Sequence, residues 1–146
     1  MPVDVLTEIE IARPRADVWA YAANPGNAPV WYENIESVTW RTEPPATQGS
    51  QVEFVARFLG RRLAYTYEIV EFVPGERLVM RTAEGPFPME TTYTWADGPG
   101  GGTRMTLRNR GEPAGFARIG APMMTRAMRK ANRKDLERLK QLLESR

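Results

Sequence analysis

Apolar and polar residues alternate along most of the first 110 positions of this chain. In the first such stretch, residues 3–11, Val5 and Ile9 fall on one side and acidic residues on the other. A period of two is typical of a half-buried β-strand. The same alternation, interrupted by turns rich in Gly and Pro, predicts six further strands: 36–42, 49–59, 62–70, 77–82, 87–95 and 103–110.

Short connections between consecutive strands indicate an antiparallel meander. For the hairpin between the strands 49–59 and 62–70 we expect a turn at Gly60-Arg61, with Phe58 paired with Leu63. This register gathers the large apolar side chains on one sheet face, as a half-buried sheet requires. It also sets Glu53 opposite Glu68, an unfavourable pair unless an arginine lies between them.

Helical spacing replaces the alternation in three segments. We expect short helices over 14–23 and 28–32, and a long one over 122–144 that is apolar on one side and basic on the other. At 1.5 Å per residue the long helix spans about 33 Å, enough to cross a small domain. Phe116 and Ile119 are expected in a short turn before it.

The composition excludes most catalytic machinery. The chain has 146 residues, 42% hydrophobic and 26% charged, which fits a single globular domain over 1–146. It contains no His and no Cys, which removes catalytic triads, thiol chemistry, disulfides and His- or Cys-based metal sites. We therefore expect no metal and no organic cofactor.

Charge is unevenly distributed along the chain. Residues 115–146 contain nine basic and three acidic residues, a net charge of +6, whereas the whole chain carries +2. The basic positions of the last helix are expected to form a solvated face, with an anionic membrane surface or an acidic partner as the alternative. No aromatic residues are interleaved for base stacking, so nucleic acid is not an expected partner. The basic positions are Arg126, Arg129, Lys130, Arg133 and Lys134.

Two further patterns bear on location and chemistry. No apolar run is long enough for a membrane span, and the N-terminus lacks the basic start and apolar stretch of a signal peptide, so a cytoplasmic protein is expected.

Glu53, Glu68 and Glu90 are expected on the outer face of their strands, together with several arginines. They are expected to form a solvated lattice of charges and not an acid–base pair.

The order of several segments resembles the START-like, or SRPBCC, superfamily. These segments are PRADVW at 14–19, Trp31, VEFVPGERL at 70–78, and the Gly-rich loop that leads into TRMT at 103–106. The chain's ending, over 128–144, is similar to the polyketide cyclase/dehydrase branch. The resemblance implies an α+β helix-grip fold, in which a curved seven-stranded antiparallel sheet surrounds the C-terminal helix and two short helices follow strand one. It also implies a cavity between sheet and helix, where family members bind lipids, sterols or polyketides and some catalyse ring closure or dehydration.

The candidate ligand-binding site is a set of aromatic and methionine side chains expected to face inward. Tyrosine hydroxyls need partners when buried, and methionines suit an adaptable wall, so the set favours a pocket over its alternative, a packed core. Asn109 shares the inner parity of its strand and is the expected polar contact. The set comprises Trp31, Trp40, Phe54, Phe58, Tyr65, Tyr67, Met80, Met89, Tyr93, Asn109, Met123 and Met124.

These observations favour binding of a small hydrophobic ligand, lipid-, polyketide- or aromatic-like, between the sheet and the last helix. One alternative is a cyclase or dehydratase that works through cavity shape and through polarisation of a carbonyl by Tyr or Asn. The second alternative is an interaction or membrane-surface module that uses the basic helix face. The expected partner is a small apolar molecule, and formation of a homodimer is left open.

Overall fold

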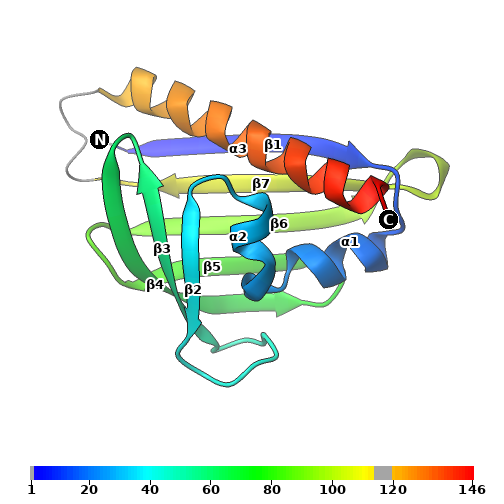
Figure 1. Ribbon diagram of the computed structural model, residues 1–146, viewed down its shortest axis with the longest axis horizontal. Coiled ribbons are helices and arrows are strands. Elements are labelled where there is room, and N and C mark those ends of the chain that lie inside the picture. The colour runs from blue at the N-terminus through cyan, green and yellow to red at the C-terminus, as the bar shows by residue number, and fades with distance from the viewer. Residues whose placement is uncertain (1, 114–119) are drawn as a thin grey trace.

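Seven antiparallel strands form one curved sheet in the computed structural model of this protein, which describes residues 2–113 and 120–146 (Figure 1). The spatial order is β1-β7-β6-β5-β4-β3-β2, so that the chain's first and second strands lie at opposite edges. The expected turn at Phe116 and Ile119 lies outside the described residues. The strands are β1 (Val3–Ile11), β2 (Ile35–Trp40), β3 (Gln51–Phe58), β4 (Arg61–Val73), β5 (Arg77–Glu84), β6 (Met89–Asp97) and β7 (Thr103–Gly111).

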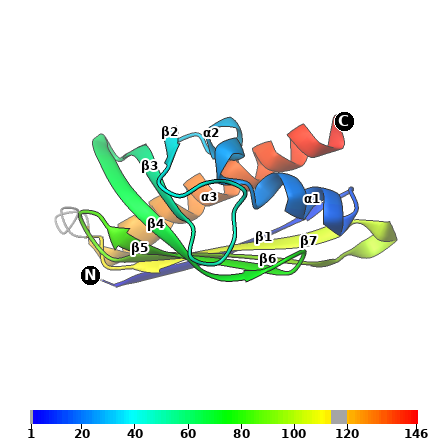
Figure 2. The same cartoon turned by 90° about the horizontal axis from the view of Figure 1, so that it is seen from below.

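The helices lie on the concave side of this sheet. Figure 2 shows α1, α2 and α3 on one side, with β2 and β3 curling toward them. The pairing of β4 with β5 shifts register at Thr66/Tyr67 and at Ile69/Glu71, and irregularities of this kind let paired strands bend. The helices are α1 (Arg15–Ala22), α2 (Ala28–Trp31) and α3 (Ala121–Glu144), with short 3-10 turns η1 (Pro25–Asn27) and η2 (Pro99–Gly101).

The β3–β4 hairpin differs from the expected register by two residues. Phe58 pairs with Arg61, because Leu59 and Gly60 alone form the turn, with φ angles of 50° and 79°. Two successive positive φ angles are typical of the tight two-residue turn that matches strand twist. Since the shift is even, the same side chains still face the interior, and the expected opposition of two glutamates disappears.

The C-terminal half of α3 anchors the helix to the sheet. Leu136, Leu139 and Leu143 are buried on its inner face. Polar contacts hold the same half from outside: Lys140 Nζ donates to the Glu10 carbonyl at 2.7 Å, and the Ala12 amide donates to Glu144 Oε2 at 2.8 Å. The N-terminal half of α3 is therefore positioned over the other part of the concave face. This arrangement is the helix-grip fold, and the expectation of that fold is confirmed.

Candidate functional site

A cavity of about 150 Å³ lies between the concave face of the sheet and the N-terminal half of α3. Residues of β3, β4, β5 and β6 form its floor, and α2 closes one side. The lining is mostly apolar with a few polar groups, as small-molecule sites usually are. Its polar members are Tyr32, Asn34, Tyr65, Tyr67, Thr82, Thr91, Tyr93, Asn109, Asn132 and Asp135.

The structure places all but two of the sequence-predicted residues on this lining. Met123 is 65% exposed, whereas its neighbour Met124 is buried. Successive helix residues point about 100° apart, so both cannot face the sheet. Trp40 packs against the core at the far end of the edge strand β2, next to Gly26, and does not line the cavity. Ligand contact by the remaining residues stays a prediction.

Two groups of aromatic rings belong to the cavity lining. In the first group, on β3 and β4, the Tyr65 ring lies 4.9 Å from the Tyr67 ring and 5.7 Å from the Phe54 ring, measured between centroids. In the second, on α2 and β6, the Trp31 and Tyr93 rings lie 5.9 Å apart. Rings at these separations form walls suited to a flat ring system.

The tyrosine hydroxyls stay protonated in this site. Burial raises the pKa of Tyr67 to about 12 and raises the pKa of Tyr65 and Tyr93 well above the ordinary value. The Tyr32 and Tyr93 hydroxyls hydrogen-bond each other, and burial also raises the pKa of Tyr32. These groups can therefore donate hydrogen bonds at neutral pH but do not act as bases there.

Asp135 brings a buried carboxyl group to the edge of the cavity. Its side chain is buried, and Oδ1 accepts a hydrogen bond from the Glu33 amide at 3.0 Å. Burial raises the pKa of Asp135 from 3.8 to about 7, against the lowering effects of the Glu33 amide and Arg138. A carboxyl with this pKa can give or take a proton near neutral pH.

Sequence reasoning missed several cavity residues, most clearly Tyr32, Thr91, Asn132 and Asp135. Thr91 lies at the inner parity of β6 beside Met89 and Tyr93, so strand parity alone could have identified it. Asn132 and Asp135 interrupt the apolar side of the last helix, and polar residues at core-facing positions are a signal of function. Tyr32 ends a very short helix and carried no periodic signal.

The family model for "Polyketide cyclase / dehydrase and lipid transport" matches residues 2–144 of the chain. The chain belongs to this family. None of the curated proteins compared with the chain matches it.

Solved structures similar to this polyketide cyclase/dehydrase family member support the same fold. A protein of Thermus thermophilus is 20% identical with a TM-score of 0.80, over 94% of both chains. A START superfamily protein of Mycobacterium smegmatis is 12% identical with a TM-score of 0.82, over 97% of both chains. The ZhuI aromatase/cyclase of a Streptomyces species is 16% identical with a TM-score of 0.80, over 99% of this chain and 94% of that one.

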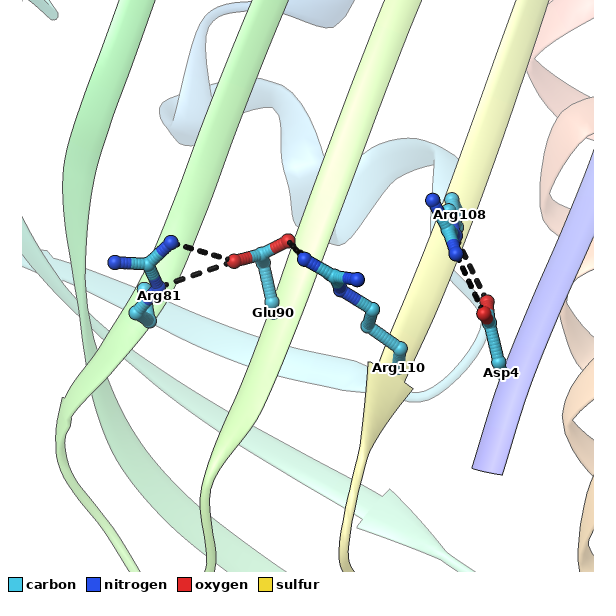
Figure 3. Close-up of polar contacts among 5 residues, drawn as sticks. All are labelled: Asp4, Arg81, Glu90, Arg108 and Arg110. Atoms are coloured by element: carbon cyan, nitrogen blue, oxygen red, sulfur yellow. Dashed lines mark hydrogen bonds and ion pairs between the residues drawn. The ribbon is translucent and has the colours of Figure 1, made fainter. Parts of the chain in front are cut away.

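Charged residues on the outer sheet face of this family member neutralise one another. Glu90 lies between Arg81 and Arg110, each 2.8 Å away, and Arg108 binds Asp4 through two hydrogen bonds (Figure 3). The arginines hold the pKa of Glu90 and of Asp4 below the ordinary value. Of the other predicted outer carboxylates, Glu53 pairs with Arg41, and Glu68 accepts a hydrogen bond from Gln51 Nε2 at 3.2 Å.

Five basic side chains of α3 differ from those of the outer sheet face in having no ion-pair partner among the described residues. The basic face of α3 is defined as these five residues, Arg126, Arg129, Lys130, Arg133 and Lys134. These five side chains line a shallow surface groove. They form no ion pair within residues 2–113 and 120–146, whereas six arginines of the sheet strands each have a carboxylate partner. Contact of this face with an anionic surface remains a prediction.

The described residues include neither a membrane-spanning helix nor a cluster of metal ligands. No helix among them is long and apolar enough to cross a membrane. No group of three Asp, Glu, His or Cys side chains that could hold a metal ion occurs in the same part of the chain.

Proposed function

We propose that this protein encloses a small, mainly apolar ligand with a ring system in the cavity between the sheet and α3. The observation that carries the proposal is an unfilled space with aromatic walls inside an otherwise well-packed core. Folded proteins rarely leave voids larger than a water molecule. Membership of a family described by cyclase, dehydrase and lipid-transport functions supports the same conclusion.

The size of the cavity limits the ligand that fits without rearrangement. An apolar cavity of about 150 Å³ can hold one benzene ring, whereas drug-sized ligands usually occupy ~300 Å³ or more. Met124 and Met128 line the cavity from α3, and flexible methionine side chains can adjust to a somewhat larger occupant. A ligand with one substituted ring is therefore the best match to the observed space.

Titration with isopropylbenzene tests this proposal. The variant Ala131→Leu adds bulk to a residue of the cavity lining, and Ala127→Leu makes the same change on α3 outside the lining. Binding is measured by the changes in NMR chemical shift during the titration. We expect the wild type and Ala127→Leu to bind isopropylbenzene. Ala131→Leu should bind it at least about tenfold more weakly, since added bulk in a packed cavity costs roughly 1–3 kcal/mol. Absence of binding to the wild type, or equal binding by all three proteins, would refute the proposal.

A cyclase or dehydratase activity is the second candidate, and the position of Asp135 favours it. A carboxyl group with a pKa of about 7 at the edge of an apolar cavity could move a proton while tyrosine or asparagine side chains polarise a carbonyl. General acid–base catalysis of this kind contributes roughly 10²–10⁴-fold.

Dehydration of the β-hydroxyketone 4-hydroxy-4-phenylbutan-2-one tests this second candidate. Loss of water gives the conjugated enone, which is followed by its ultraviolet absorbance. The wild type should accelerate the reaction and Asp135→Asn should lose at least about 10²-fold of that acceleration. Equal rates with and without the wild-type protein would exclude this reaction.

A further inference from the structure

Four polar side chains form a continuous hydrogen-bonded chain along the wall of the cavity. The Tyr67 hydroxyl lies 2.9 Å from Thr91 Oγ1. Thr91 donates to Asn109 Oδ1 at 2.6 Å, and Asn109 Nδ2 donates to Asn132 Oδ1 at 3.2 Å. The chain therefore joins β4, β6 and β7 of the sheet to α3, and all four residues belong to the cavity lining.

The number of hydrogens that each group can donate fixes the direction of every hydrogen bond in this series. A threonine hydroxyl has one hydrogen, and Thr91 uses it toward Asn109, so Tyr67 must donate to Thr91. Each link then donates toward α3, and the oxygen of Asn132 is occupied by the Asn109 amide. Asn132 Nδ2 is left at the end of the chain, buried and with no hydrogen-bond partner in the described part of the protein.

A buried donor without an acceptor destabilises a protein, and native structures rarely contain one. Asn132 is only 5% exposed, so bulk water does not satisfy its amide. Among the described residues the ring nitrogens of Trp31, in the lining, and of Trp19 and Trp95, outside it, are also buried without a partner, so an unpaired indole is not specific to the cavity. An indole N–H can only donate, as can the Asn132 amide nitrogen. Asn132 lines the cavity, so an occupant with an acceptor would satisfy its amide nitrogen.

The charge of the lining restricts the kind of acceptor. None of the described residues that line the cavity is a lysine or an arginine, and the only carboxyl group there is that of Asp135. A carboxylate or phosphate would therefore enter an apolar site without a counter-charge, which is unfavourable. A neutral carbonyl supplies lone pairs without this cost.

We propose that the ligand carries a neutral carbonyl group whose oxygen accepts a hydrogen bond from Asn132 Nδ2, while its ring lies between the aromatic walls. This inference rests on the proposed ligand-binding function and specifies its ligand as an aryl ketone or a related carbonyl compound. Asn132 is held ready for this role, because the Asn109 amide occupies its oxygen and directs its nitrogen away from that bond.

Two probes with the same heavy-atom skeleton test the inference. Acetophenone has a carbonyl oxygen where isopropylbenzene has a methyl group, so they differ in the acceptor but little in shape. Dissociation constants are measured by NMR titration for the wild type, for Asn132→Leu, and for the control Met128→Leu, which changes a lining residue without polar hydrogens. We expect Asn132→Leu to weaken acetophenone binding by roughly two- to twelve-fold, as for one neutral hydrogen bond, and to change isopropylbenzene binding less than about twofold. The control should change both constants by the same factor.

A second measurement uses the wild-type protein alone and does not depend on the variant folding. Acetophenone should move the side-chain amide proton resonances of Asn132 downfield, and isopropylbenzene should not. If the wild type binds both probes but Asn132→Leu weakens them equally, or if the amide resonances respond equally to both, the carbonyl inference is wrong and the apolar binding function stands. If the wild type binds neither probe, both proposals fall.

Discussion

Replacing Asp135 by Asn should change how the stability of this protein depends on pH. Burial raises the pKa of Asp135 from 3.8 to about 7. Between these values the folded protein keeps a proton that the unfolded chain releases, so stability falls as the pH rises through this range. At about 1.36 kcal/mol per pKa unit, a shift of about three units corresponds to a loss of about 4 kcal/mol at about pH 8 relative to about pH 4.

The surroundings of Asp135 explain why the raised pKa persists. The Glu33 amide and Arg138 favour the ionised carboxylate, but desolvation, together with the negative charge of the Glu33 side chain, outweighs both. The buried Tyr32 and Tyr93 hydroxyls face the same region, and they remain neutral because their own pKa values are raised. An asparagine at 135 keeps an oxygen for the Glu33 amide and has no charge to desolvate.

Urea unfolding at about pH 5 and pH 8, followed by circular dichroism, measures the effect. The wild type should lose about 2 to 3 kcal/mol between these two conditions, because at pH 5 the unfolded chain has already released most of this proton, and Asp135→Asn should lose little. The carboxyls with lowered pKa, among them Asp4, Glu90 and Glu144, contribute stability that is lost only as the pH falls below their ordinary values. They are therefore constant over this window. Identical pH profiles for the two proteins would show that Asp135 is not desolvated as argued.

Four further outcomes are expected. Met124→Ala should lower the unfolding free energy by about 2–5 kcal/mol, because Met124 is 1% exposed, while Met123→Ala should change it by less than about 0.5 kcal/mol. Tyr67→Phe should cost about 1 kcal/mol in denaturant unfolding, since its hydroxyl hydrogen-bonds Thr91. Glu90→Gln should cost about 1–3 kcal/mol near neutral pH, a difference that closes as the pH falls through the lowered pKa of Glu90. Binding of the basic face to phosphatidylserine vesicles, measured by sedimentation, should weaken about fivefold in Lys130→Gln, which removes one positive charge, and disappear at high salt.

Local periodicity was sufficient to predict the strands and helices of this chain. A strand with one buried face must alternate with period two, and a helix against a sheet must place apolar residues about 100° apart, whatever the rest of the chain does. These rules located β1 and α3 closely and assigned Phe54, Tyr67 and Tyr93 to the inner face. The predicted β3–β4 register was wrong by two residues. The same side chains still face inward, because side chains alternate along a strand with a period of two. The curvature of the sheet and its packing around α3 were predicted from the family resemblance, since periodicity does not determine how far a sheet bends.

Only the tertiary structure decided which inward-facing residues line the cavity and which pack in the core. Trp40 and Tyr93 both alternate along their strands so as to face inward. Trp40 nevertheless packs at the end of an edge strand, whereas Tyr93 lines the cavity. Asn132 and Asp135 acquire their properties from neighbours distant in sequence: Asn132 from the amide of Asn109, and Asp135 from burial beside Glu33. An unpaired donor and a raised pKa depend on what surrounds a group in three dimensions, and periodicity carries no such information because it describes only the direction in which each side chain points.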